Sequence, residues 1–362
     1  MFTSSGRSDV GRVRVSNQDS GYAGQYLLVV ADGMGGHAGG DVASHIAVNH
    51  LLELDREFTT VAAASKALRA RIMSANKMIV DVVDNYPQLS GLGTTLSVVL
   101  RVGSKAVVAH IGDSRIYRLR SGQLTQITQD HTFVQHLIDS GQITEAEAAV
   151  HPRRSVLMRV LGDVDAHPNI DVFTVDLLPN DTWVLCSDGL TGCLSDSDIA
   201  SLIQAHKKVD ALANALISRS LDEGAPDNVT VIVTQISATS SDVAQRASEL
   251  VGSASADNPL KTLPKATDTG PTIPRAKAQS LPVHTGGIPI ADRLEAIENL
   301  AHESPLPKSS RRVLWVIVLV ALAIIGAVVW LVLATSNSHA LSETGPSVSR
   351  ALTVVDGSWH VY

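Results

Sequence analysis

The sequence predicts a layered α+β fold followed by one C-terminal transmembrane helix. Helical periodicity over 42–54 and again over 68–82 is followed by several short apolar segments between 95 and 128. Strands that are grouped together, rather than strictly alternating with helices, are typical of an α+β domain. Farther along, residues 313–334 include no charged side chain and are long enough to cross a hydrocarbon core of about 30 Å.

The first strand is expected at Leu28–Asp32, because a short apolar run stops there at an Asp-Gly turn. Two helices follow over 42–54 and 68–82. Tight turns at Gly103-Ser104 and Ser121-Gly122 connect the next strands, and connections this short join antiparallel neighbours. The later elements are expected as strands at Thr95–Val102, Lys105–Ile111, Arg115–Arg120 and Gln123–Thr128, an irregular helical region at 132–162, and strands near 182–187 and 229–236 enclosing helices around 196–220.

The composition favours a large core and disfavours nucleic-acid binding. Hydrophobic residues make up 44% of the 362 residues, whereas aromatic residues make up only 4%, so the core must consist mainly of Val, Leu, Ile and Ala. The net charge of −7 leaves no basic stripe of the kind that nucleic acids require. The two cysteines, Cys186 and Cys193, are expected to be reduced core thiols of a cytosolic domain.

The chain divides by composition into four parts. Residues 5–237 are expected to form one folded domain, and no apolar stretch before it suggests a signal peptide. Residues 238–312 are rich in Ser, Thr, Ala, Pro and Lys without sustained periodicity, as expected for a flexible linker. Residues 313–334 form the predicted transmembrane helix, and 335–362 form a short extracytoplasmic tail.

Charges beside the predicted span determine its expected orientation. Trp315 and Trp330 lie near its two ends, where aromatic side chains favour the membrane interface. Basic residues are concentrated on the N-terminal side, whereas the tail has only Arg350. The positive-inside rule therefore predicts a single-pass protein of the cell membrane whose N-terminal domain is cytoplasmic. The basic residues of the N-terminal side are Lys308, Arg311 and Arg312.

Two similar segments each end on an aspartate followed by glycine. Asp32-Gly33 ends the apolar run that begins at Leu28, and Asp188-Gly189 ends the run that begins at Val184. Two strand ends placed side by side would hold two carboxylates a few ångströms apart, where they repel each other unless a cation lies between them. This pattern predicts a metal site.

Two more acidic residues fit the same site. Asp227 leads a turn before an apolar strand, and Asp19 ends the segment that begins at Arg14. Four converging carboxylates would be neutralised by two divalent cations, and all-oxygen ligands suit magnesium or manganese. The planar guanidinium of Arg14 is suited to binding a phosphate group.

A dinucleotide site is an alternative interpretation of the first motif. Residues 33–38 match G-x-G-x-x-A after a strand and before a helix, and Glu53 lies twenty residues beyond Gly33. However, Glu53 falls inside a predicted helix, whereas this motif places its acid at the end of a second strand. Asp32 would also put a carboxylate beside the pyrophosphate, so the metal interpretation is favoured.

Six short signatures lie in order across 5–237. They are Arg14-x-x-Asn17-Gln18-Asp19, Val30-Ala31-Asp32-Gly33-Met34-Gly35-Gly36-His37, Gly93-Thr94-Thr95, Gly112-Asp113-Ser114-Arg115, Ser187-Asp188-Gly189 and Asp227-Asn228-Val229-Thr230. Each signature alone is an ordinary turn sequence, but the six together, in this order, resemble the type 2C metal-dependent serine/threonine phosphatases, the PPM family.

The resemblance implies a four-layer αββα sandwich of two antiparallel sheets flanked by helices, with two Mn²⁺ or Mg²⁺ ions at one end. It implies a metal-bridging hydroxide that hydrolyses phosphoserine and phosphothreonine in proteins. Residues 141–159 resemble the flap beside the family's cleft. The implied roles are Asp32 as bridging ligand, Gly33 as carbonyl ligand, Asp188 and Asp227 as direct ligands, Asp19 as a ligand through water, Asp113 with Asp188 at the third metal site of bacterial members, and Arg14 as the phosphate-binding residue.

The resemblance also implies the partners and leaves one catalytic role open. Phosphoprotein substrates, receptor-type Ser/Thr kinases among them, and lipid around the span are expected, without nucleic acid. Met34 stands where many eukaryotic relatives have a histidine that is a candidate general acid, so His37 and His131 are candidate substitutes beside metal-bound water. The alternative function is a catalytically silent, membrane-tethered signalling scaffold, which the presence of every matching acid disfavours.

Overall fold

The computed structural model describes residues 2–35, 39–86, 89–162, 168–237 and 247–256. Among these residues there is no helix with the length and apolar character needed to span a bilayer. The predicted transmembrane helix at 313–334, the tail at 335–362 and most of the predicted linker lie outside the described residues.

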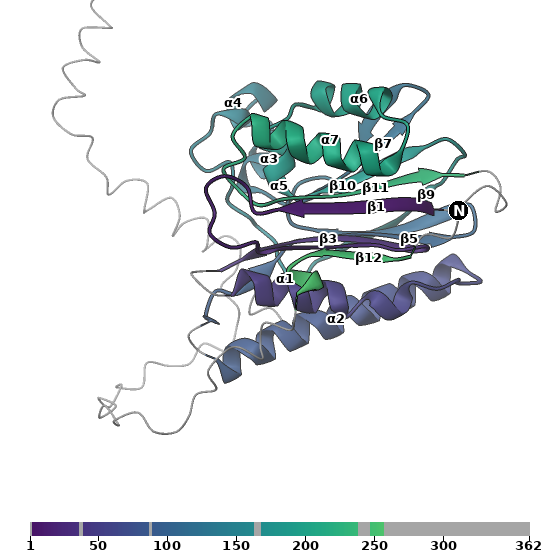
Figure 1. Cartoon of the computed structure of the whole chain (residues 1–362). Coiled ribbons are helices and arrows are strands. Elements are labelled where there is room, and N and C mark those ends of the chain that lie inside the picture. Colours follow the sequence, from purple (N-terminus) through teal and green to yellow (C-terminus); the bar gives the residue numbers. More distant parts are fainter. Residues whose placement is uncertain (1, 36–38, 87–88, 163–167, 238–246, 257–362) are drawn as a thin grey trace, which may run out of the picture. The chain divides into compact units, whose positions relative to one another are not determined.

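Two antiparallel sheets form the centre of the domain (Figure 1). The first has the strand order β1 (Phe2–Asp9), β11 (Val229–Ile236), β10 (Thr182–Cys186), β7 (Arg115–Arg120) and β8 (Gln123–Gln126). The second has the order β12 (Glu249–Gly252), β2 (Asp19–Ala23), β3 (Leu27–Met34), β5 (Leu96–Val102), β6 (Lys105–Ile111) and β9 (Asp171–Asp176), with the short β4 (Gly93–Thr94) paired to β3.

Helices cover the outer faces of both sheets, and the order of layers confirms the predicted αββα sandwich (Figure 1). On the second sheet lie α1 (Gly40–Asn49) and α2 (Val61–Asn85), with the 3₁₀ turn η1 (Leu52–Leu54) between them. On the first sheet lie α6 (Asp196–Ala205) and α7 (Val209–Asp222). Shorter helices are α3 (Phe133–Asp139), α4 (Glu145–Ala149) and α5 (Asp188–Thr191).

The first five residues of β3, 27–31, are all apolar because both faces of this strand are buried. Successive side chains of a strand point to opposite faces. Leu27 and Val29 therefore pack toward α1 and α2, whereas Leu28 and Val30 pack against the other sheet, beside Trp183. Because both faces are covered, neither set of positions tolerates polar residues.

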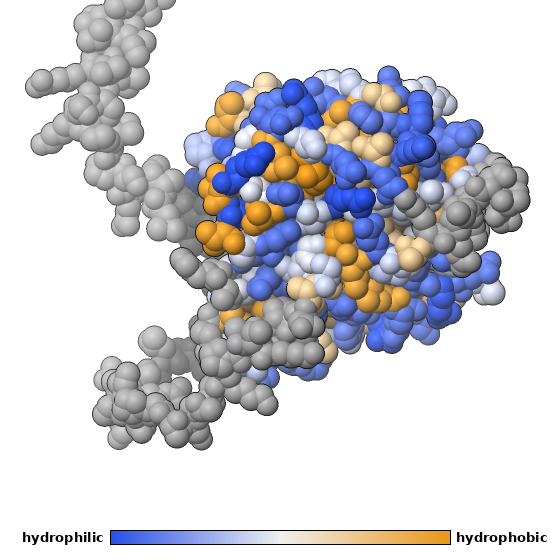
Figure 2. Space-filling model, in the orientation of Figure 1, coloured by the Kyte–Doolittle hydropathy of each residue, from blue (hydrophilic) through white to orange (hydrophobic). Residues whose placement is uncertain are grey.

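The buried apolar side chains of the described residues form three main clusters, one between the sheets and one under each helical layer. The face of the molecule in Figure 2 is correspondingly mainly hydrophilic, with apolar side chains in separate small groups. The sandwich thus has the aliphatic core that the composition predicts.

The structure corrects one boundary of the predicted linker, which the composition placed at 238–312. Within that range, residues 249–252 form strand β12, and Ser253–Ser255 form the 3₁₀ helix η3. Val251 and Ala254 are buried in the core clusters. The Ser- and Ala-rich composition of the surrounding segment concealed this strand, because it has only four residues, of which two are apolar.

Candidate active site

The predicted site residues come from both sheets. In the β2–β3 pair, Asp19 lies directly opposite Asp32. In the other sheet, Asp188 begins α5 two residues after β10 ends, and Asp227 lies two residues before β11 begins. Because β10 and β11 are neighbours, their ends bring these two residues to the same end of the sandwich.

One pocket of about 360 Å³ joins these strand ends. Met34 also lines it, together with Leu157 of the region that resembles a flap. Asp19 is not among the lining residues, because it is only 1% exposed and lies beneath them. The predicted site residues that line the pocket are Arg14, Asp32, Gly33, Asp113, Asp188 and Asp227.

Two buried carboxylate oxygens in this region have no hydrogen-bond partner. They are Oδ1 of Asp19 and Oδ1 of Asp188. The other oxygen of Asp19 accepts a hydrogen bond from Ser187 Oγ at 2.7 Å. Leaving a buried carboxylate oxygen unpaired is unfavourable, and a cation satisfies it without a proton donor. The donor set therefore fits an oxygen-ligated divalent metal.

The raised pKa values of these carboxyl groups also fit a divalent-metal site. Burial, reinforced by the charges of Asp188 and Asp227, raises the pKa of Asp19 to about 7. Burial and the neighbouring carboxylates raise the pKa of Asp32 well above its ordinary value. Burial and then Asp188 raise the pKa of Asp113 to about 7, and burial and then Asp227 raise the pKa of Asp188. The site holds more negative charge than its protein surroundings stabilise.

Arg14 pairs directly with one of the acids. Its Nη2 atom donates to Asp227 Oδ2 at 2.6 Å. Across the described ranges, no three His, Cys, Asp or Glu side chains gather closely enough to hold one ion. The carboxylates therefore share a pocket without closing around one point, as expected when like charges repel and a guanidinium neutralises one of them.

The Gly93-Thr94-Thr95 signature holds the backbone of Asp32. Thr95 Oγ1 accepts from the Asp32 N–H at 2.9 Å, and the Thr95 N–H donates to the Asp32 carbonyl at 2.9 Å. Thr94 Oγ1 donates to the same carbonyl. These contacts fix the strand end that presents Asp32, so the role of this signature is structural.

Asn228 is a site residue whose role the sequence did not reveal. Its amide nitrogen donates to the carbonyls of Val10 and Ser16, and its Oδ1 accepts from the N–H of Gln18. It therefore fixes both ends of the loop that presents Arg14. An Asn next to a predicted ligand was the available signal, although Asp-Asn is also an ordinary turn sequence.

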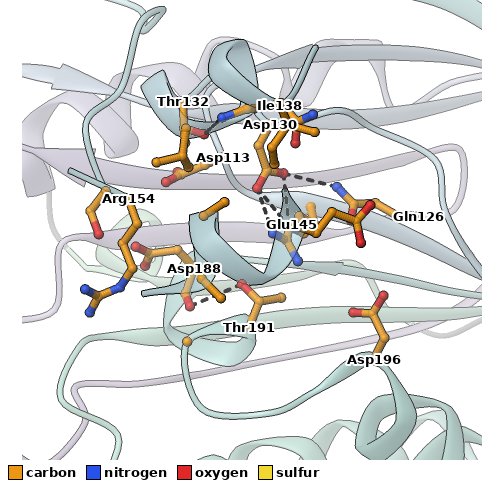
Figure 3. Close-up of a pocket in the computed structure, with 17 residues that line it drawn as sticks. Asp113, Gln126, Asp130, Thr132, Ile138, Glu145, Arg154, Asp188, Thr191 and Asp196 are labelled. Atoms are coloured by element: carbon orange, nitrogen blue, oxygen red, sulfur yellow. Dashed lines mark hydrogen bonds and ion pairs between the residues drawn. The ribbon is translucent and has the colours of Figure 1, made fainter. Parts of the chain in front are cut away.

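A second pocket, of about 550 Å³, adjoins the first (Figure 3). Asp113 and Asp188 line both pockets, as does Ser155. Figure 3 shows that Glu145 and Arg154, from the predicted flap region 141–159, also line this second pocket. The flap-like segment thus borders the predicted metal site, as the resemblance implies.

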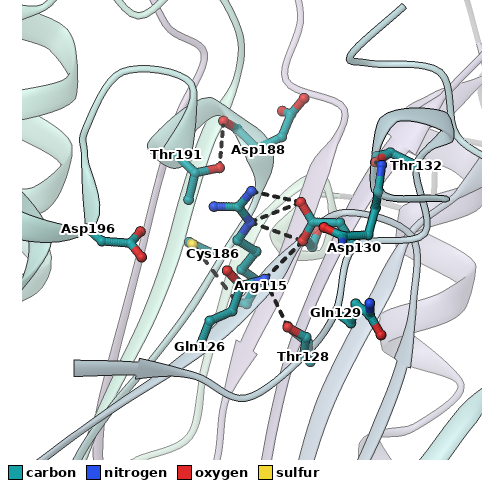
Figure 4. Close-up of polar contacts among 12 residues, drawn as sticks. Arg115, Gln126, Thr128, Gln129, Asp130, Thr132, Cys186, Asp188, Thr191 and Asp196 are labelled. Carbon is teal, nitrogen blue, oxygen red and sulfur yellow. Dashed lines mark hydrogen bonds and ion pairs between the residues drawn. The ribbon is translucent and has the colours of Figure 1, made fainter. Parts of the chain in front are cut away.

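The floor of the second pocket includes a rigid ion pair (Figure 4). Arg115 donates to Asp130 from both Nε and Nη2, and its Nη1 donates to Tyr117 Oη. Tyr117 in turn donates to Asp196. Bidentate pairing of this kind fixes geometry, so it holds the strand that begins two residues after Asp113.

His131 is held away from both pockets. It is 8% exposed, its Nδ1 accepts from the Gly112 N–H, and its Nε2 lies 3.1 Å from Asp171. These contacts give it a role in fixing the Gly112-Asp113 turn. His37 lies outside the described residues. Met34, by contrast, is 39% exposed and lines the first pocket.

The dinucleotide alternative is not supported by the fold. That motif belongs to a parallel βαβ unit. Here β3 pairs antiparallel with β2, β4 and β5, and every strand pair in the described part of the chain is antiparallel.

Known proteins similar in sequence to this chain are serine/threonine phosphatases. The serine/threonine protein phosphatase PstP of Mycobacterium tuberculosis is 43% identical over 258 residues, which are 71% of this chain and 49% of the relative. The chain thus matches about half the length of that relative. The serine/threonine phosphatase stp of Listeria monocytogenes is 37% identical over 237 residues, 63% of this chain and 94% of the relative.

Solved structures match the same domain. The M. tuberculosis phosphatase PstP/Ppp aligns with a TM-score of 0.62 at 43% identity, covering 65% of this chain and 99% of that one. The PstP catalytic domain in complex with two manganese ions aligns with a TM-score of 0.60 at 42% identity, covering 65% and 98%. Residues 12–230 match the family described as protein phosphatase 2C. The chain therefore belongs to the protein phosphatase 2C family.

Proposed function

We propose that this chain is a metal-dependent protein phosphatase that hydrolyses phosphoserine and phosphothreonine. The observation that supports this most directly is the single pocket in which Asp32, Asp188 and Asp227 meet Arg14. It places cation-binding carboxylates beside a phosphate-binding guanidinium. Relatives named serine/threonine phosphatases share the fold and the domain.

Two divalent cations, manganese or magnesium, would be held by Asp32, Asp188, Asp227 and the Gly33 carbonyl. Asp19 lies behind this set and would act through water, and Asp113 with Asp188 would hold a third ion. When bound, such cations acidify the attacking water and neutralise charge on the phosphate. The complex of the PstP catalytic domain with two manganese ions supports the proposed stoichiometry.

Arg14 is proposed to bind and orient the phosphate group. Its side chain is 52% exposed, so the guanidinium is accessible to a substrate at the mouth of the pocket. A guanidinium binds two phosphate oxygens with parallel hydrogen bonds, which orients the phosphorus toward the carboxylate end of the pocket. Asp227, which Arg14 contacts in this structure, would then be free for a cation.

Assaying the chain with p-nitrophenyl phosphate and a phosphothreonine peptide tests this proposal. Hydrolysis should require manganese or magnesium and stop in EDTA. Asp32→Ala and Asp227→Ala should each reduce turnover by several orders of magnitude, because each removes a ligand on which the cations depend. Folded protein that binds manganese without hydrolysing either substrate would instead support the silent scaffold.

We also propose that residues 313–334 anchor the protein in the cell membrane, in contact with lipid, with the phosphatase domain cytoplasmic. The uncharged span and the basic residues on its N-terminal side support this orientation. Phosphoproteins of the cytoplasm, receptor-type Ser/Thr kinases among them, would then be substrates. Protease added to intact spheroplasts should remove at most the tail at 335–362. Digestion of the domain from outside would contradict the orientation.

A further inference from the structure

The chain returns to the metal-binding end of the sandwich after its last central strand. β12 pairs antiparallel with β2, from Glu249 opposite Ala23 to Gly252 opposite Ser20. β12 is therefore the neighbour of β2 on the side away from β3. The family match ends at residue 230, so this segment lies beyond it.

Polar contacts fix the start of this segment. Glu249 accepts from Arg7 Nη1 at 3.0 Å and from the Gly6 N–H at 3.2 Å. Ser248 Oγ donates to Asp55 at 3.1 Å. The segment is thus attached both to β1 of the other sheet and to the turn after η1.

Its other end contacts the turn that presents Asp19. Ser253 Oγ donates to the carbonyl of Asn17, and the Ser253 carbonyl accepts from His45 Nδ1 at 3.0 Å. Gly252 has a φ of +66°, and a Cβ atom there would collide with the carbonyl oxygen of Asp19. Gly252 therefore lies against the backbone of Asp19, and Ser253 lies against the backbone of Asn17.

This contact matters because β12 covers the side of β2 that β3 leaves open. The sequence of β2, Asp-Ser-Gly-Tyr-Ala, contains no branched aliphatic residue, and without β12 this strand would be the edge strand of its sheet. Asn17 also accepts from the Asp19 N–H at 3.1 Å, so a shift of Asn17 moves Asp19 directly. The unpaired Oδ1 of Asp19 is the atom whose position this determines.

We propose that residues 247–255 form a strap that positions Asp19 for metal binding, with Gly252 and Ser253 as its positioning residues. The inference rests on the proposed function in taking Asp19 as part of the metal site. The strap supplies no ligand. It fixes β2 from the side opposite β3, so the segment that leads toward the predicted membrane anchor takes part in forming the metal site.

Gly252→Ala in the full-length protein tests the strap, with Gly122→Ala as a matched control. Both glycines have positive φ, +66° and +82°, but a Cβ at Gly122 meets nothing within 4 Å. Manganese affinity of the metal-free proteins is measured by titration calorimetry. Loss of groups that orient ligands lowers metal affinity by about 10- to 100-fold, and this is the expected effect of Gly252→Ala. Gly122→Ala should bind manganese like the unmodified protein.

A second pair of variants covers the case in which Gly252→Ala fails to fold. Ser253→Ala removes the hydroxyl that donates a hydrogen bond to the Asn17 carbonyl, whereas Ser253→Thr keeps a hydroxyl at this position. Manganese affinity should fall in the first and return in the second. Unchanged affinity in both Gly252→Ala and Ser253→Ala would overturn the strap, even if their metal-free melting temperatures fall. Because the readout is metal binding, it is independent of whether the protein hydrolyses phosphate esters.

Discussion

At the scale of single residues, the pair between Arg14 and Asp227 connects the two halves of the site. The same guanidinium that contacts Asp227 at 2.6 Å is the group suited to bind phosphate. A cation at Asp227 would release Arg14 for the substrate. Metal binding and substrate binding are therefore expected to favour each other.

Arg14→Ala should raise KM for phosphate esters without weakening manganese binding. Charge-assisted hydrogen bonds contribute about 1.5–3 kcal/mol, which corresponds to roughly 10- to 150-fold in KM if they are made equally in ground and transition states. Arg12→Ala is the control, because Arg12 is an exposed arginine on the same loop that does not line the pocket. Steady-state kinetics measure KM, and a manganese titration measures metal affinity, in both variants. Weaker manganese binding with an unchanged KM would show that Arg14 is misassigned.

The raised pKa values predict how pH affects the metal-free domain. Burial raises the pKa of Asp19 from 3.8 to about 7. A carboxyl group with a raised pKa stabilises the folded state fully below its unfolded pKa, and this contribution is lost as the pH rises through about 7. Asp113, with its pKa also about 7, acts in the same direction. The metal-free domain should therefore become less stable as the pH rises from about 4 to about 7.

Manganese should reverse that trend, because cations bind the deprotonated carboxylates. The increase in melting temperature on adding manganese should be small near about pH 5.5 and large near about pH 8. Thermal unfolding of EDTA-treated protein, with and without manganese, measures it. An equal increase at both pH values would contradict the proposed metal binding by these groups.

At the scale of elements, strands with apolar runs or joined by tight turns were predictable, whereas polar strands without such a turn were not. The runs that became β3, β5, β6 and β10 are largely buried on both faces, so they consist mainly of apolar residues. The edge strand β9 is largely exposed, and β1 has the polar sequence Phe-Thr-Ser-Ser-Gly-Arg-Ser-Asp. These strands form through pairing with distant neighbours, which local sequence does not encode.

The same distinction applies to the site. The aspartates were predictable because each one adjoins a turn at an element end. Thr95 holds Asp32, and Asn228 holds the loop of Arg14, through contacts between segments far apart in the chain, so the signatures that contain these two residues did not reveal their roles. The pairing of Arg14 with Asp227 also joins segments far apart in the chain, so no spacing indicated it.

Thr95→Val should lower kcat by about tenfold, because the Asp32 N–H loses its hydrogen-bond acceptor and the strand end shifts. Thr95→Ser keeps the hydroxyl and is the matched control. Turnover of p-nitrophenyl phosphate at saturating manganese measures both. If valine and serine behave alike, Thr95 serves packing alone.

At the scale of the whole molecule, the folded domain includes the strap. A chain ending at residue 237 would lose the burial of Val251 and Ala254. The expected decrease in the free energy of unfolding is about 2 kcal/mol relative to a chain ending at 256. Solved structures of relatives align with 65% of this chain and with nearly the whole of each solved chain. This supports independent folding of the domain without the C-terminal part of the chain. Urea unfolding of the two proteins measures the difference, and equal midpoints would contradict it.

In the proposed metal site, carboxylates from the two sheets bind cations together at one end of the sandwich. Anomalous diffraction at the manganese edge, from crystals of the domain soaked in manganese, tests this arrangement most directly. Two peaks are expected within the pocket bounded by Asp32, Asp188 and Asp227, with any third peak beside Asp113. Crystals with no manganese in this pocket, or with ions bound only elsewhere on the domain, would contradict it.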